Sequence, residues 1–280
     1  MKNIRIIPRL DIKGPNLVKG IHLEGLRVLG EPSRFAKYYY EQGADEIIYQ
    51  DTVASLYERN SLTDIINKTA KEIFIPLTVG GGIRTMQDIQ DVLRAGADKV
   101  SINTAAVRDP NFINEASNYY GSSTIVIAIE ALKKEDGKYY VFTDNGREET
   151  FKEATSWAKE VEDRGAGEIF LTSIDNEGTG SGFDLDLIRI VSSQSLLPVV
   201  AHGGPSDYSH ISEAILEGKA DAISLASMLH YEAASSFELD ELGEGNLEFL
   251  KSKKNYKNFN SDSLTKIKSR LVLDGFNVRP

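Results

Sequence analysis

The sequence predicts one α/β domain over residues 1–280, a (β/α)8 TIM barrel built from two duplicated half-barrels. Eight short apolar runs alternate with longer amphipathic stretches, which is the pattern of parallel strands joined by helices. The length of 280 residues suits one such barrel, because these barrels commonly need about 250 residues. Segments of the first half also recur in the second half, which indicates a duplication.

The apolar runs are rich in Ile, Val and Leu. They predict strands at residues 4–11, 46–51, 76–79, 99–102, 124–129, 168–171, 198–201 and 222–225. Helices are expected to begin near Ser33, Ser61, Thr85, Asp109, Thr150, Asp184 and Ser206. Thr85 and Asp88 have the spacing of a capping box. A left-handed helix end is typical of glycine, and we expect one at Gly43, Gly96, Gly165 and Gly218.

Three blocks repeat in the same order. GADEII at residues 43–48 is matched by GAGEIF at 165–170, so the offset is 165 − 43 = 122. IPLTVGGG at 75–82 is matched by LPVVAHGG at 197–204, again with an offset of 122. ADKVSINT at 97–104 is matched by ADAISLAS at 220–227, with an offset of 123. Agreement in both order and spacing predicts equivalent positions in the two halves.

Three further segments decorate the predicted barrel. KKEDGKYYVF at residues 133–142 predicts a hairpin that turns at Asp136 and Gly137. Residues 13–30 form a long connection with four glycines, for which a mobile lid and an ordinary solvated loop are equal alternatives. The polar segment at about 236–262 is expected to be a surface elaboration of the last unit, or else a partner-docking element, before an amphipathic stretch at 263–273.

Composition excludes several classes of function. The formal net charge of −10 argues against a nucleic-acid partner. Because the chain has no cysteine, a disulfide framework, a zinc–thiolate site and a cysteine nucleophile are excluded. It has no signal-peptide core and no apolar run that could span a membrane, so we expect a cytoplasmic protein without a membrane partner. The four histidines lack ligand spacing, and we expect neither a metal nor a cofactor.

Two carboxylates end equivalent strands. Active sites of (β/α)8 barrels form at the carboxyl ends of the strands. Asp11 ends the first strand and Glu130 ends the fifth, its repeat mate. Opposed carboxyl groups in different surroundings can divide the roles of general acid and general base. We therefore predict Asp11 and Glu130 as the catalytic pair, although a single strand-terminal carboxylate more often orders a loop.

Glycine-rich turns in both halves predict two phosphate sites. Gly81 and Gly82 follow the third strand, and Gly203 and Gly204 follow the seventh. Glycine lets backbone N–H groups approach an oxyanion closely, and the next helix adds the positive end of its dipole. Further donors are predicted at the neighbouring strand ends, at Asn103, Thr104, Ala226 and Ser227. Two such cradles across one mouth indicate an elongated, bisphosphorylated small molecule.

Loops around the mouth offer further ligand contacts. Lys19, in the connection at 13–30, could meet the negative charge of a ligand. The segment DNEGTG at 175–180 places Asp175, Gly178 and Thr179 after the sixth strand, where ligand hydroxyl groups could bind. His202 precedes the second glycine pair, and the roles of ligand donor and packing residue are equally open for it.

Charged residues begin four of the predicted strands, at the opposite end of the barrel. They are Arg5, Glu46, Lys99 and Glu168. Alternating charges there could form a salt-bridged ring that closes the floor. A structural plug is the ordinary interpretation, because a partly buried charge needs its partners. A gate is the alternative.

Nearly the whole sequence resembles the HisF family, the cyclase subunits of imidazole glycerol phosphate synthase. The matching motifs are LDIK at 10–13, VKG at 18–20, VGGGI at 79–83, DKVSINTAA at 98–106 and RGAGEIFLTSID at 164–175. The resemblance implies a barrel that receives ammonia from a HisH-like glutaminase on its N-terminal face. It also implies that Arg5, Glu46, Lys99 and Glu168 form the ammonia gate.

In this family, ammonia reacts with a bisphosphorylated ribulosyl aminoimidazole carboxamide to give imidazole glycerol phosphate and AICAR. Aspartates that match Asp11 and Glu130 act as acid and base. Three positions depart from the family pattern: Glu130 replaces aspartate, Arg9 replaces cysteine and His202 replaces serine. One methylene in the catalytic carboxylate is enough to alter geometry and rate.

These departures leave alternative functions open. A HisF paralogue could deliver ammonia for amidino-sugar formation in surface polysaccharide biosynthesis. The sister isomerase, HisA, shares the duplicated barrel but needs no ammonia, and the charged floor argues against it. A non-catalytic barrel that only activates a glutaminase is a fourth possibility, and its activity would not depend on Asp11.

Overall fold

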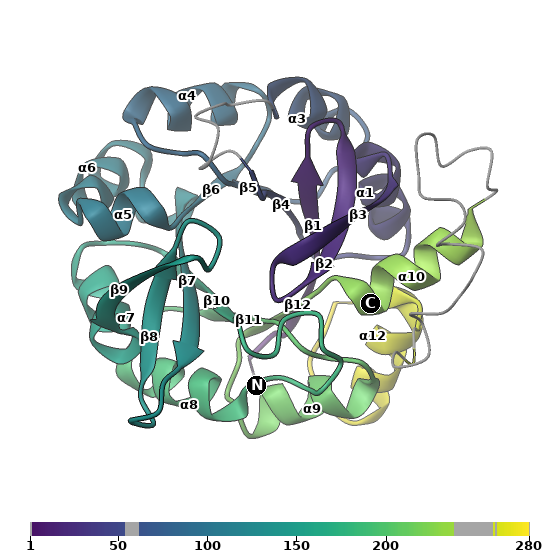
Figure 1. The fold of residues 1–280 in the computed structure, drawn as a ribbon. Coiled ribbons are helices and arrows are strands. Elements are labelled where there is room, and N and C mark those ends of the chain that lie inside the picture. The colour runs from purple at the N-terminus through teal and green to yellow at the C-terminus, as the bar shows by residue number, and fades with distance from the viewer. Residues whose placement is uncertain (1, 54–61, 238–259, 261, 280) are drawn as a thin grey trace.

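The computed structural model describes residues 2–53, 62–237, 260 and 262–279. Eight parallel strands form a closed ring, because β10 pairs with β7 as well as with β11. In ring order they are β1 (Arg5–Lys13), β4 (Ile47–Asp51), β5 (Leu77–Gly80), β6 (Lys99–Ile102), β7 (Ile125–Lys133), β10 (Glu168–Ser173), β11 (Val199–His202) and β12 (Ala222–Leu225). Figure 1 shows helices surrounding this ring. The (β/α)8 fold and all eight predicted strands are confirmed.

Helices connect the strands and cover the outside of the ring (Figure 1). In the described parts of the chain they are α1 (Pro32–Glu41), α3 (Thr63–Ala70), α4 (Met86–Arg94), α5 (Thr104–Arg108), α6 (Asn111–Tyr120), α7 (Ala154–Asp163), α8 (Leu185–Gln194), α9 (Tyr208–Leu216), α10 (Ser227–Ser236) and α12 (Leu264–Leu273), with the 3-10 turn η1 (Ser122–Thr124). The predicted capping box begins α4, where Thr85 and Asp88 each accept the other's backbone N–H. Ser61 lies outside the described residues.

Two predicted helix boundaries are wrong. Thr150 lies inside a strand, β9 (Glu148–Glu153), where its hydroxyl donates to the Val141 carbonyl over 2.7 Å. At Gly218 the left-handed residue is its neighbour Lys219, with a φ of 65°. A Cβ on Gly218 would lie 2.7 Å from the Ala214 carbonyl, so glycine serves close packing at this position. The other three predicted glycines, at 43, 96 and 165, do have positive φ.

Two hairpins lie over the carboxyl end of the ring (Figure 1). The first consists of β2 (Asn16–Ile21) and β3 (Glu24–Gly30), and β2 also pairs with the end of β1. The alternative of an ordinary solvated loop at 13–30 is therefore wrong, because buried Leu17 and Val18 anchor a strand there, and the mobile lid stays a prediction. The second hairpin, predicted at 133–142, is confirmed: β7 continues into β8 (Tyr139–Thr143), and β9 pairs beyond it.

Apolar side chains fill the structure in two places. The larger cluster lies between the strands and the helices. A second cluster fills the inside of the ring and consists of Ile7, Ile48, Val126, Ala128, Phe170, Val200 and Ala222. Apolar side chains therefore line the inside of the barrel between the polar residues of the floor and those of the mouth.

The C-terminal helix α12 confirms the amphipathic stretch predicted at 263–273. Its buried Lys268 donates to the Gly43 carbonyl over 2.7 Å and to the Asp45 carboxylate over 3.0 Å, which fixes the helix to the barrel. Most of the elaboration expected at 236–262 lies outside the described residues. Within the described ranges, we find no helix with the length and apolar character needed to cross a membrane.

Candidate active site

Alternate residues of β1 point into the ring and divide its interior into layers. Arg5 lies at the floor, Ile7 belongs to the interior apolar cluster, and Arg9 and Asp11 follow toward the mouth. This order follows from the two-residue period of a strand. The equivalent residues of β7 are Val126, Ala128 and Glu130. The inward face of β1 therefore contributes residues both to the charged floor and to the candidate active site.

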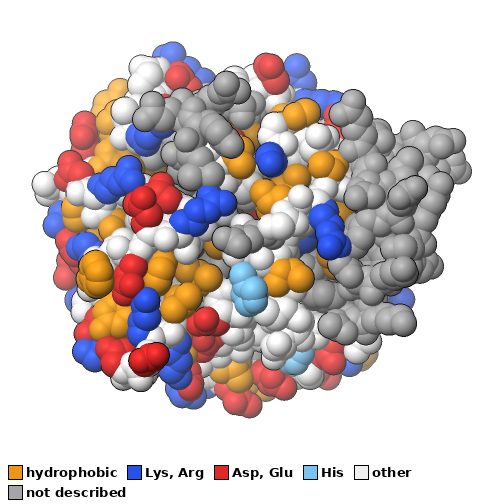
Figure 2. Space-filling model, in the orientation of Figure 1, with side chains coloured by type: hydrophobic (Ala, Val, Ile, Leu, Met, Phe, Trp, Pro, Cys, Tyr) orange, Lys and Arg blue, Asp and Glu red, His pale blue; other side chains and the backbone are white. Residues whose placement is uncertain are grey.

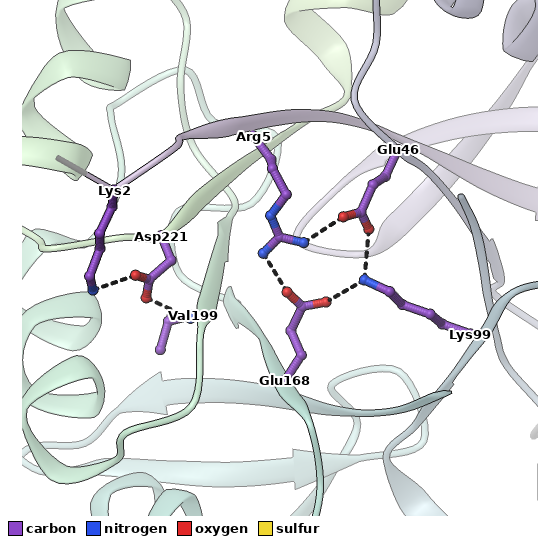
Figure 3. A network of polar contacts seen from close by, with 7 residues as sticks. All are labelled: Lys2, Arg5, Glu46, Lys99, Glu168, Val199 and Asp221. Carbon is purple, nitrogen blue, oxygen red and sulfur yellow. Dashed lines mark hydrogen bonds and ion pairs between the residues drawn. The ribbon is translucent and has the colours of Figure 1, made fainter. Parts of the chain in front are cut away.

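The four predicted floor residues form a closed ring of ion pairs (Figure 3). Arg5 contacts Glu46 at 2.5 Å and also bonds Glu168. Lys99 Nζ lies 3.0 Å from Glu46 Oε2 and 3.2 Å from Glu168 Oε2. Burial lowers the pKa of Arg5, but the two carboxylates outweigh this effect and raise it. Since each buried carboxylate has two cationic partners, the ring offsets the desolvation of its charges.

Asp11 is paired with two buried cations. Arg9 Nε donates to Asp11 Oδ1 over 2.7 Å, and Lys19 Nζ lies 3.9 Å from Oδ2. The exposed fractions are 1% for Arg9, 2% for Asp11 and 4% for Lys19. Loss of the Asp11 charge would leave the buried Arg9 without its ion-pair partner, which is strongly unfavourable, whereas Lys19 would keep Glu177.

Glu130 lies in a different environment. It is almost fully buried, Oε2 has no hydrogen-bond partner, and the backbone N–H of Gly146 donates to the carboxyl group. Burial raises the pKa of Glu130 to about 7, against the opposing effects of Arg9 and the Gly146 bond. A large part of Glu130 is therefore protonated near neutral pH. A carboxylic acid and an ion-paired carboxylate are the arrangement that general acid–base catalysis requires.

A cavity of about 350 Å³ opens beside Glu130. Its lining includes Gln50, Asp51, Gly81, Gly82, Ser101, Asn103, Thr104, Arg108, Glu130, Asp144 and Asn145. A Cβ on Gly81 would lie 2.3 Å from the Asp51 carbonyl, at a φ of +98°, so this turn requires glycine. The structure thus brings four predicted phosphate-site residues into one cavity with Glu130.

The second glycine turn is nearly filled. A space of only about 10 Å³ is lined by Glu177, Gly178, His202, Gly203, Gly204, Pro205, Ala226 and Ser227. The five predicted residues of this half, Gly178 among them, therefore lie together. A Cβ on Gly178 would lie 2.8 Å from the Gly20 carbonyl, so the β2–β3 hairpin packs closely against the loop beside this space.

The tip of the hairpin is held by Glu177, which is 1% exposed. The backbone N–H of His22 donates to the Glu177 carbonyl over 2.9 Å, and that of Leu23 donates to its Oε2 over 3.1 Å. Lys19 bonds the other carboxylate oxygen. One glutamate thus binds both the turn and the strand of the hairpin.

Replacing Glu177 with glutamine is expected to loosen the hairpin. The amide keeps an acceptor for Leu23 but leaves the buried Lys19 with less negative charge, which is unfavourable. We expect amide hydrogens of residues 16–30 to exchange at least about tenfold faster, as measured by mass spectrometry. Glu149→Gln, which affects only a partly exposed contact with Lys134, is the control. Equal exchange in the two variants would contradict the assignment.

Three predicted ligand residues lie outside both cavities. Asp175 is exposed and accepts the Lys133 backbone N–H over 3.0 Å. The Thr179 hydroxyl donates to the Asn176 carbonyl over 2.7 Å and so orders its own loop. Lys19 is buried beneath the hairpin. The structure does not bring these three side chains to the cavity beside Glu130.

A turn that the sequence analysis did not predict supports Glu130. Asp144, Asn145 and Gly146 all have left-handed backbone angles, with φ of 51°, 61° and 77°. The Asp144 N–H donates to Thr104 Oγ1 over 3.1 Å, and the Asn145 side chain donates to the Leu23 carbonyl over 3.3 Å. The adjacent Asn and Gly are a sequence signal for such a turn. The turn therefore links Glu130, the first cradle and the hairpin tip.

The face seen in Figure 2 carries both Lys or Arg and Asp or Glu side chains, with apolar side chains between them. Charges of both signs are interspersed over the part of this face that the structure describes. A basic surface of one sign, as nucleic-acid binding requires, does not extend over that part.

Sequence comparisons place the chain among known proteins. Residues 5–235 match the model of a family described as "Histidine biosynthesis protein". A Legionella pneumophila protein named imidazole glycerol phosphate synthase subunit HisF is 57% identical over 204 residues, which cover 73% of this chain and 96% of that protein. A protein of the same name from Nostoc sp. is 46% identical, and the match covers 85% of this chain and 93% of that protein. Another from Methanocaldococcus jannaschii is 48% identical, and the match covers 81% of this chain and 90% of that protein. The chain therefore belongs to the histidine biosynthesis protein family and, within it, to the HisF proteins.

Proposed function

We propose that this chain is the ammonia-dependent cyclase subunit of imidazole glycerol phosphate synthase. In this reaction a bisphosphorylated ribulosyl aminoimidazole carboxamide and ammonia give imidazole glycerol phosphate and AICAR. The observation that carries the proposal is the placement of a protonated Glu130 and an ion-paired Asp11 inside a barrel whose mouth has two glycine cradles. The names of the HisF relatives support the same reaction.

The two carboxyl groups suit the two proton transfers that the reaction needs. When ammonia adds to a carbonyl carbon, the nitrogen must lose a proton and the oxygen must gain one, and the oxygen then leaves as one molecule of water. Glu130, with its raised pKa, donates a proton to the departing oxygen. Asp11 accepts the proton from nitrogen, and its ion pair with Arg9 holds the carboxylate in place. The cradles bind the two phosphate ends and orient the substrate between these groups.

A HisH-like glutaminase docks on the floor face in this proposal. Four exposed apolar side chains lie in segments that lead to the amino ends of strands: Phe74, Tyr119, Leu196 and Leu216. Since all amino ends of the strands meet at the floor, these side chains lie toward the floor side of the barrel. Apolar groups gathered on one face are typical of a protein interface.

Replacing Arg5 with methionine is expected to break the ion-pair ring and so to impair the delivery of ammonia from the glutaminase. Glu46 and Glu168 each lose a partner, so the floor opens and ammonia escapes to solvent. We expect glutamine-dependent turnover with the glutaminase to fall at least about tenfold, while turnover with added ammonium salt stays within about threefold. Lys2→Met, which removes the neighbouring pair with Asp221, is the control (Figure 3). Equal losses with both nitrogen sources would contradict a gate.

The direct test of the proposed function uses the purified chain and an ammonium salt. Consumption of the bisphosphorylated intermediate with formation of AICAR, followed by chromatography, is the expected result. Failure to consume it would overturn the proposal. The amidino-sugar alternative is not favoured, because the compared relatives carry the synthase name. The HisA alternative predicts isomerisation without any requirement for ammonia.

A further inference from the structure

Several buried polar atoms inside the barrel have no hydrogen-bond partner, among them Ser101 Oγ and Ser224 Oγ. Three of them belong to ionisable side chains: Nη2 of Arg9, Oε2 of Glu130 and Nε2 of His202. Their residues are exposed by only 1%, 6% and 4%. Buried polar atoms in proteins are almost always paired, so three unpaired ones in one region point to a small polar ligand.

Strand register places the three side chains in one layer. Thr172 of β10 is in register with Glu130 of β7 on one side and with His202 of β11 on the other. The Arg9 side chain crosses the interior from β1 toward β10, where Nη1 lies 3.5 Å from Thr172 Oγ1. Its guanidinium lies over the ring of Phe170, 5.5 Å from the centroid. This layer therefore separates the interior apolar cluster from the mouth.

The three atoms have complementary hydrogen-bonding roles. An arginine nitrogen only donates. His202 Nδ1 lies 3.2 Å from the Ser224 carbonyl, so Nδ1 carries the hydrogen and Nε2 is left as an acceptor. Burial, together with the charges of Arg9 and Lys19, lowers the pKa of His202 far below its usual value and keeps the ring neutral. A protonated carboxyl group still accepts a hydrogen bond at one oxygen, so Glu130 supplies a second acceptor at Oε2 while its proton lies on the other oxygen.

We propose that Arg9, His202 and Glu130 form a binding site for one molecule of neutral ammonia. The ammonia lone pair accepts from Arg9 Nη2, and two of its N–H groups donate to His202 Nε2 and Glu130 Oε2. Ammonium has no lone pair to accept that bond and is repelled by the permanent charge of Arg9. Water has both donors and lone pairs and is the competing occupant. The inference rests on the proposed function, in which ammonia rises through the interior.

The test measures steady-state kinetics with ammonium salts, expressed as the concentration of neutral ammonia. Arg9→Lys keeps a positive charge beside Asp11 but lacks Nη2, and His202→Phe keeps an aromatic ring on Phe170 but lacks Nε2. We expect each variant to raise the KM for ammonia at least about tenfold. The KM for the bisphosphorylated substrate should stay within about twofold.

Control measurements distinguish an ammonia site from other roles of Arg9 and His202. Arg189→Met removes an exposed arginine and should leave both KM values unchanged. A loss of kcat alone in Arg9→Lys would show that Arg9 acts only by positioning Asp11, and would overturn the ammonia site. If His202→Phe raised the KM only for the bisphosphorylated substrate, the ammonia site would also be overturned, because His202 would then belong to the second cradle.

The experiment gives different results if the ammonia site is wrong and if the proposed cyclase function is wrong. Wild-type protein that turns over the substrate, with both variants unchanged in the KM for ammonia, refutes the site alone. Wild-type protein that shows no turnover refutes both. Thermal melting establishes that each variant is folded, and His202→Leu replaces His202→Phe if the larger ring disrupts the second cradle.

Discussion

Glu130→Gln is expected to lower kcat at least about a thousandfold with saturating ammonium salt and substrate. The amide has nearly the same volume and keeps an oxygen for the Gly146 N–H, but it cannot transfer a proton. General acid–base catalysis contributes about 10²–10⁴ in rate, and the effect should therefore lie in kcat. Glu130→Asp, which keeps the acid but withdraws it by one methylene, should lose only about a hundredfold. A fully active glutamine variant would remove Glu130 from the mechanism.

The raised pKa of Glu130 also predicts the pH dependence of activity and of stability. In the wild type, kcat should fall as the pH rises through about 7, because Glu130 must carry a proton to act as an acid. In the unfolded chain the same group ionises near its usual value of 4.5. The free energy of unfolding therefore decreases as the pH rises from about 4.5 to about 7, by roughly 3 kcal/mol in total.

Denaturant unfolding at two pH values checks this linkage. Since Glu130→Gln has no charge to bury, it should be more stable than the wild type at pH 8 and nearly equal to it at pH 4.5. A wild-type protein whose kcat is unchanged between pH 6 and pH 8, with product release excluded as the slow step, would contradict the acid role. An inactive and more stable glutamine variant would show that this carboxyl group is kept for catalysis.

Asp11→Asn is expected to lose as much activity and also to destabilise the fold. The loss in kcat should reach at least about a thousandfold, because no other group takes the proton from nitrogen. Arg9 would remain buried without its ion-pair partner, which costs about 3–5 kcal/mol in such pairs, while Lys19 would keep Glu177. Denaturant unfolding measures the second effect independently of the first.

The double variant Asp11→Asn with Arg9→Met separates the two effects. Removing both members of the pair should recover most of the lost stability but none of the activity. Unchanged activity in Asp11→Asn would support the non-catalytic activator of a glutaminase that the sequence leaves open. Recovery of activity in the double variant would show that Asp11 serves only to neutralise Arg9.

Much of the architecture could be predicted because its signals are local. Each strand is a short apolar run between turn residues, and the glycines at 81 and 204 occupy backbone angles that other residues rarely adopt. The floor residues could be found because each begins a strand, and the ends of all strands meet. The duplication then suggested that features of one half have a counterpart in the other.

The remaining features depend on contacts between distant residues. Glu177 holds Lys19 across 158 positions, and Arg9 reaches Thr172 across 163, so neither pairing has a local signal. The hairpin at 13–30 was not predicted because its turn residues, His22 and Leu23, are not the usual Asn and Gly. For the same reason, the packing of the hairpin against Gly178 could not be foreseen from the glycine pair alone.

The His22–Leu23 turn has a consequence for how the hairpin tip keeps its shape. Both residues have left-handed backbone angles, with φ of 51° and 62°, and such angles cost about 1 kcal/mol or more for each side chain other than glycine. The backbone bonds of His22 and Leu23 to Glu177 offset this strain. Without that glutamate, the turn would relax to other backbone angles, so one buried side chain from a distant loop determines the conformation of the tip.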